Sequence, residues 1–115
     1  MLKSKLADYE RCDHKDGLIV WYEKESDEIV CTLSLTKYNG QMWIGAVYVA
    51  PAYRGKGMCR ALLDFATFNG GDHLAVRKTN IPALTAYRNY GFRPYDEDET
   101  NYFMRYEDAE GVSIR

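Results

Sequence analysis

The chain has 115 residues, of which 46% are apolar, and its formal net charge at pH 7 is −2. A chain of this length is expected to fold as one compact domain, residues 1–115, around one core. Its basic residues are scattered apart from one stretch, which argues against nucleic acid as the main partner. Three widely spaced cysteines match neither a disulfide framework nor a zinc site, so the sequence predicts no metal.

The start of the chain shows no secretory signal pattern, because charged and polar residues follow Met1 and Leu2. The longest apolar run, 42–52, is too short to cross a bilayer. We therefore expect a soluble cytoplasmic protein with no membrane partner.

The first predicted elements are a short helix and a strand. Residues 1–16 are polar, and Leu2, Leu6 and Tyr9 are spaced as in one short helix. The β-branched and aromatic residues at 18–22 predict the first strand.

Two further strands are expected to complete an antiparallel meander. Apolar and polar residues alternate over 29–36, and the Asn39-Gly40 pair after them is a strong hairpin signal. Residues 42–49 are almost continuously apolar, which predicts a central strand covered on both faces.

In the second half of the chain the pattern changes to helices separated by strands. Apolar residues recur at helical spacing over 58–66, and Asn69-Gly70-Gly71 ends this helix. A strand is expected over 73–78. A second helix is expected between Asn80, a good N-cap, and Gly91, a good residue just after a helix end.

The last predicted elements are strands over 92–95 and 101–106, and the tail 107–115 is expected to fray. The resulting order, β-β-β-α-β-α-β-β, predicts an α/β domain with a mixed sheet.

The basic stretch Arg54-Gly55-Lys56-Gly57-Met58-Cys59 joins the third meander strand to the first helix. Free N–H groups at a helix start favour anions, glycines allow close approach of a ligand, and two cations add charge. The stretch therefore predicts a pyrophosphate site. It lacks the Ser or Thr of a Walker A loop and the third glycine of a Rossmann turn.

Two motifs together are more specific than the glycine turn. Residues 49–59 match V-x-P followed by R/Q-x-x-G-x-G/A, except that Cys59 replaces the last Gly or Ala. Residues 80–92, NIPALTAYRNYGF, match N-x-x-A-x-x-x-Y-x-x-x-G-F. With both motifs in this order, residues 17–106 resemble the GNAT superfamily of N-acetyltransferases, as a small member with a shortened N-terminal part.

The resemblance implies a GNAT-like fold in which the central strand and the next strand splay apart. Acetyl-CoA would be the co-substrate, with its pantetheine arm between these strands and its pyrophosphate at the glycine turn. The implied cofactor-binding residues are Val47, Tyr48, Val49, Arg54, Gly55, Lys56, Gly57, Met58, Cys59, Asn80 and Ala83. For Asn80, helix N-cap and pantetheine contact both remain open.

The resemblance also implies the chemistry. A primary amine would attack the thioester directly in a ternary complex, and Tyr87 lies at the family's frequent general-acid position. No general base is assigned, because the central strand carries no acid. Glu23 is expected to be a solvated residue beside the first hairpin, and His73 an ordinary polar histidine at a strand start. A nucleophilic role for Cys59 is disfavoured, since the motif places it beside the pyrophosphate.

Family members usually open with a strand and two helices that wall the acceptor site, but only about sixteen residues precede the first predicted strand here. This favours a bulky acceptor, such as a protein lysine or an N-terminal amine. The alternatives are a non-catalytic CoA-binding or protein-interaction module on the same fold and a nucleotide-binding protein. Monomer and homodimer both remain open.

Overall fold

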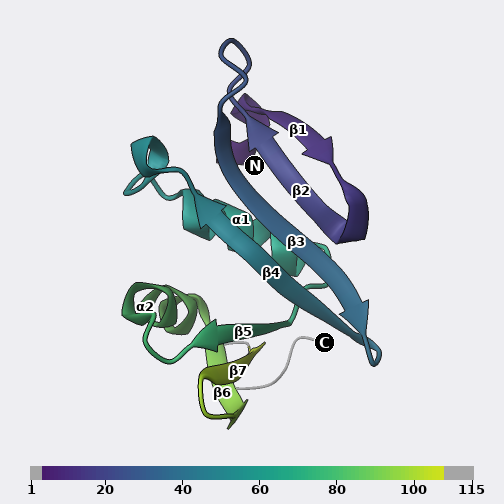
Figure 1. The fold of residues 1–115 in the computed structure, drawn as a ribbon, viewed down its shortest axis with the longest axis vertical. Helices are drawn as coiled ribbons and strands as arrows, with labels where there is room; N and C mark the ends of the chain where they lie inside the picture. The colour runs from purple at the N-terminus through teal and green to yellow at the C-terminus, as the bar shows by residue number, and fades with distance from the viewer. Residues whose placement is uncertain (1–3, 108–115) are drawn as a thin grey trace.

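The computed structural model describes residues 4–107, which form a seven-stranded mixed sheet with two α-helices on it (Figure 1). The strand order is β1-β2-β3-β4-β5-β7-β6, with β4 and β5 parallel and the other neighbouring pairs antiparallel. The elements are η1 Lys5–Asp8, β1 Glu10–Asp13, η2 Lys15–Gly17, β2 Leu18–Tyr22, β3 Ile29–Tyr38, β4 Gln41–Val49, η3 Pro51–Tyr53, α1 Met58–Phe68, β5 His73–Arg77, α2 Ile81–Tyr90, β6 Phe92–Glu97 and β7 Asn101–Tyr106, where η marks a 3-10 turn. The α/β prediction with a mixed sheet is confirmed.

The prediction of one short helix within residues 1–16 is wrong for residues 10–13, which form a strand. The chain makes one 3-10 turn, η1, and then the strand β1, which pairs antiparallel with β2. All four side chains of β1 are exposed. Strand β1 is held by backbone pairing and has no buried face. Its sequence therefore shows no alternation of apolar and polar residues from which the strand could have been predicted. Leu2 lies outside the described residues.

The meander forms as predicted. Strands β2, β3 and β4 pair in sequence, and the turn between the last two contains Asn39 and Gly40 with φ of 50° and 75°. Positive φ at both central residues is the geometry that favours Asn-Gly in tight hairpins.

Strand β4 contains a bulge near its end. Ser34 pairs with Gly45 and Thr32 with Tyr48, so Ala46 and Val47 together oppose the single residue Leu33. Ala46 has a φ of 49°, and its carbonyl accepts a hydrogen bond from Thr32 Oγ1 at 2.5 Å. The bulge changes the direction of the strand just before the residues predicted to line the cofactor.

The prediction that β4 is covered on both faces is wrong. Ile44 is its only buried residue, and the side chain of Tyr48 is 45% exposed. The helices α1 and α2 both pack on one face, where Leu62, Tyr87 and Phe92 belong to one core cluster with Ile44. Within residues 4–107 no α-helix covers the other face, so the apolar run of β4 is half open to solvent (Figure 1).

The predicted splay of the central strands is visible in the register. β4 and β5 pair only through Trp43 with His73 and Ile44 with Leu74. Beyond these two positions the strands separate, and Figure 1 shows the two arrows diverging towards their tips. The backbone of residues 47–49 therefore has no partner strand on its β5 side.

The remaining elements follow the sequence signals closely. α1 ends before Asn69-Gly70-Gly71, and Asn80 and Gly91 cap α2. The predicted tail lies outside the described residues beyond Glu107. No helix among the described residues is long and apolar enough to cross a membrane.

The core between α1 and the sheet gives a direct test of this packing. Leu62 is fully buried on α1, whereas Phe68 near the end of the same helix is 87% exposed. We expect Leu62→Ala to lower the free energy of unfolding by about 2–5 kcal/mol, because it leaves a cavity. Phe68→Ala should change it by about 0.5 kcal/mol or less. Equilibrium urea unfolding measures both, and equal effects would contradict the placement of α1.

Candidate active site

The glycine turn lies where β4 ends and α1 begins. Gly55 and Gly57 have φ of 75° and 82°, and Gly57 is the N-cap residue of α1. A side chain at Gly57 would be strained by this φ, so the position favours glycine. The first backbone bond into the helix runs from the N–H of Ala61 to the carbonyl of Gly57 at 3.1 Å.

The first N–H groups of α1 are therefore free of intrahelical partners, and no side chain caps them. A cavity of about 250 Å³ adjoins this turn. It is lined by Val49, Tyr53, Arg54, Gly55, Gly57, Met58 and Cys59. The structure thus brings the end of β4 and most of the predicted pyrophosphate residues around one space next to a helix N-terminus, which attracts anions.

The side chains of the turn differ in what they offer. Arg54 folds back, and its Nε donates a hydrogen bond to the carbonyl of Val49 at 2.8 Å. Lys56 lies over the ring of Tyr53, with its Nζ 5.8 Å from the ring centroid. Met58 is buried in the core, so it can meet a ligand in the turn only through its backbone.

The turn is anchored by contacts that the sequence did not reveal. The hydroxyl of Tyr53 donates a hydrogen bond to Glu23 Oε2 at 3.3 Å, and its ring meets that of Tyr9 edge to face at 5.8 Å. Burial, followed by the charge of Glu23, raises the pKa of Tyr53. Glu23 was expected to be a solvated residue beside a hairpin. It instead ties the turn to the meander, and no local signal could have shown this.

Tyr87 projects from α2 into the core side of the sheet and is 8% exposed. Burial raises its pKa to about 12, with a smaller contribution from nearby Cys59. Its ring contacts Phe92 edge to face at 6.1 Å. This pKa keeps the hydroxyl protonated at neutral pH, so the group can act as a hydrogen-bond donor.

At the other motif, Asn80 serves as the N-cap of α2. Its Oδ1 accepts a hydrogen bond from the N–H of Ala83 at 3.3 Å. The N-cap interpretation of Asn80 is therefore confirmed, and a pantetheine contact stays a prediction. Ala83 is half-buried against the core, and Val47 and Val49 also pack against it.

His73 lies at the paired end of β4 and β5 and is buried. Its Nδ1 is 2.8 Å from Asp72 Oδ1, and its ring lies 5.2 Å from Trp43 and 5.6 Å from Tyr95. These contacts explain His73 as part of the packed sheet. Residues 4–107 contain no group of three or more His, Cys, Asp or Glu side chains that could hold a metal ion.

Comparison with known proteins identifies the fold family. The model of the acetyltransferase (GNAT) family matches residues 2–92, most of the chain. The chain belongs to the GNAT acetyltransferase family. The matched residues include both motifs, at 49–59 and 80–92.

One curated relative carries a specific name. Streptothricin acetyltransferase from Streptomyces lavendulae is 41% identical over 66 residues, which are 52% of this chain and 35% of that protein. The chain thus spans about a third of the length of this relative.

Solved structures agree on the fold. Nourseothricin acetyltransferase aligns with a TM-score of 0.60 at 26% identity, covering 77% of this chain and 63% of that chain. A GNAT family acetyltransferase from Elizabethkingia anophelis, solved with acetyl-CoA bound, aligns with a TM-score of 0.61 at 18% identity, covering 78% and 74%. The latter likeness supports the fold alone.

The three cysteines of this GNAT chain should differ in reactivity. Cys12 is exposed, Cys59 is half-buried and Cys31 is fully buried. Burial raises the pKa of the Cys59 thiol despite its place in the first turn of α1, and raises that of Cys31 to about 11. Because the thiolate is the reactive form, we expect iodoacetamide at pH 8 to alkylate Cys12 at least about tenfold faster than Cys59.

Mass spectrometry of the native protein over time measures the three rates, and the unfolded protein is the control in which they converge. Alkylation of Cys59 as fast as that of Cys12 would instead mark Cys59 as an activated nucleophile.

Proposed function

We propose that this chain binds acetyl-CoA and catalyses transfer of its acetyl group to a primary amine. The observation that carries the proposal is the separation of β4 from β5 beyond their two paired positions, next to the glycine turn, where Cys59 lies near Tyr87. Acetyl-CoA supplies the activated acetyl group as a co-substrate, and the protein supplies the binding groups and the proton donor.

The proposed donor site runs along the unpaired side of β4. Strand β5 does not pair with Val47, Tyr48 or Val49, so backbone groups there that lack a partner can hydrogen-bond to the amide groups of a pantetheine arm as a strand would. The carbonyl of Val49 already accepts the hydrogen bond from Arg54 Nε. The N–H groups from Gly55 to Cys59 can bind the pyrophosphate. The buried Met58 and the folded-back Arg54 leave the backbone as the main phosphate ligand there.

Two groups of the chain are proposed to act on the reacting atoms. A backbone N–H near Val47, next to the bulge, would polarise the thioester carbonyl and stabilise the oxyanion. The hydroxyl of Tyr87 would give its proton to the leaving sulfur. A phenol with a pKa of about 12 remains protonated through the physiological range, so it can serve as this acid.

No residue is proposed as general base. Glu23 accepts the hydrogen bond from Tyr53, and His73 is buried against Asp72. Solvent water would then take the proton that the attacking amine loses.

Two observations bear on the acceptor. The name of the 41% identical relative favours an amine of a streptothricin-type antibiotic. The connection between β1 and β2 consists only of residues 14–17, which contain the 3-10 turn η2, so no α-helix stands between these strands to enclose the acceptor. This open face also accommodates a protein lysine or N-terminus as the second candidate.

Replacing the proposed acid tests whether the chain is an enzyme or a binding module. We expect Tyr87→Phe to lower kcat for acetyl transfer about 100-fold or more while leaving the Kd for CoA unchanged, because a general acid acts on the leaving group. Tyr38→Phe, at a residue 66% exposed and far along the sheet, is the matched control.

Thiol release gives the rates and calorimetry gives the Kd. Since Tyr87 stays protonated until about pH 12, wild-type activity should show no Tyr87-dependent loss up to pH 10. CoA binding without turnover by the wild type, over a broad amine panel, would support the non-catalytic module.

An acceptor panel tests the two amine classes. We expect acetylation of streptothricin to be at least about tenfold faster in kcat/KM than acetylation of lysine peptides or peptide N-termini, a difference of about 1.4 kcal/mol in transition-state binding. Mass spectrometry of the products locates the acetyl group. The reverse order would establish a protein amine as the preferred acceptor.

A further inference from the structure

A cation outside both motifs lies at the glycine turn. The 3-10 turn η1 contacts α1, and its residue Leu6 belongs to the core. Leu6 is buried in the core at 5% exposure, and its N–H donates a hydrogen bond to Ser4 Oγ at 3.2 Å. Because its neighbour is anchored in this way, the backbone of Lys5 has a defined position over the start of α1.

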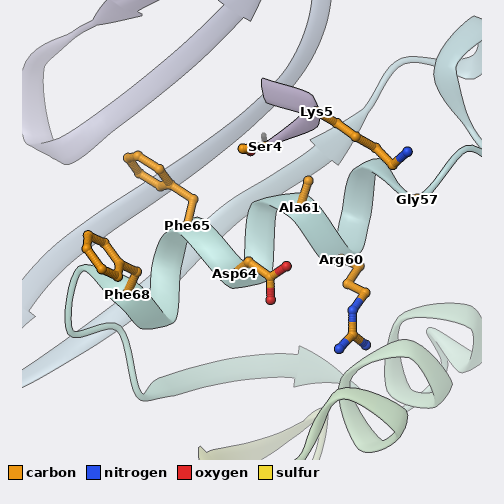
Figure 2. Close-up of a pocket in the computed structure, with 8 residues that line it drawn as sticks. All are labelled: Ser4, Lys5, Gly57, Arg60, Ala61, Asp64, Phe65 and Phe68. Atoms are coloured by element: carbon orange, nitrogen blue, oxygen red, sulfur yellow. The ribbon is translucent and has the colours of Figure 1, made fainter. Parts of the chain in front are cut away.

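The side chain of Lys5 runs across the first turn of α1 towards Gly57 (Figure 2). Its Cε is 3.1 Å from the position that a Cβ on Gly57 would take. Lys5, Gly57 and Arg60 line one cavity of about 480 Å³ along the outer side of α1, together with Ser4, Ala61, Asp64, Phe65 and Phe68. Since Gly57 also borders the cavity at the glycine turn, Lys5 lies next to the proposed pyrophosphate site.

Lys5 places a positive charge beside the start of α1, where a negative charge is usual. Carboxylates are favoured at the positive end of a helix and cations are disfavoured there. The first turn of α1 contains no acidic residue, and among residues 4–107 no carboxylate forms an ion pair with Lys5. Asp64, in the same cavity, accepts a hydrogen bond from Tyr90 at 2.6 Å. An anionic ligand at the turn would balance this charge.

We propose that Lys5 is a specificity-determining residue that binds a phosphate group of acetyl-CoA. The inference rests on the proposed function, since it adds a ligand from the N-terminal turn to the donor site of the two motifs. It makes η1 part of the cofactor site and gives this chain a preference for phosphorylated donors over pantetheine.

Calorimetric Kd values for CoA, dephospho-CoA and pantetheine with the full chain test this role. We expect Lys5→Gln to weaken CoA binding about tenfold at low salt, and less as salt is raised, because the contact is a partly exposed charge pair. Lys5→Arg should bind CoA within about threefold of the wild type, and Kd for pantetheine should not change in either variant. Lys37→Gln removes one charge at the opposite end of β4 and is the matched control.

The nucleotide portion identifies the phosphate involved. If dephospho-CoA shows the same tenfold loss, Lys5 binds the pyrophosphate; if only CoA shows it, Lys5 binds the 3′-phosphate. Equal CoA affinity of Lys5→Gln and the wild type would overturn the inference, as would a matching loss for pantetheine. Failure of the wild type to bind CoA at all would overturn the proposed function itself.

Discussion

The two-residue pairing between β4 and β5 is the constraint on which the site depends. Trp43 with His73 and Ile44 with Leu74 hold the two halves of the sheet together, and the bulge at Ala46 then turns β4 away. Backbone groups that leave a ladder need another partner. The backbone groups of β4 beyond this pairing are therefore the ones with which the proposed extended ligand would pair.

The core and the two α-helices lie on one face of the sheet, beside the point where β4 and β5 separate. The core between the sheet and the two helices is continuous, with Leu62, Leu74 and Phe92 all buried in it. The Tyr90 hydroxyl donates a hydrogen bond to Asp64 and lies within hydrogen-bond distance of the Thr67 hydroxyl, and both contacts tie α2 to α1. The two helices thus pack together on one face of the sheet, and α2 places Tyr87 in the core on that face. Among residues 4–107 no α-helix lies on the opposite face of the sheet.

Prediction from the sequence succeeded where a local signal is strong. The bounds of β2 and β7 match the predicted ranges 18–22 and 101–106, because β-branched and aromatic residues bounded by turn residues define a strand locally. Prediction failed for β1, because its side chains are all exposed and show no apolar alternation. It also failed for β4, which was expected to be covered on both faces. An apolar run shows that a strand can be buried, but the cover must come from elsewhere in the chain.

The sequence by itself determined the order of most elements, the glycine turn, the caps of α2 and the two motifs of the family. These features depend on backbone preferences and side chains within one or two turns of each other. Only the tertiary structure decided that Arg54 binds the carbonyl of Val49, that Glu23 holds Tyr53, and that Lys5 reaches Gly57. The last two contacts join residues far apart in the chain, and all three depend on how the elements pack, so they exist only once the sheet and its helices have formed.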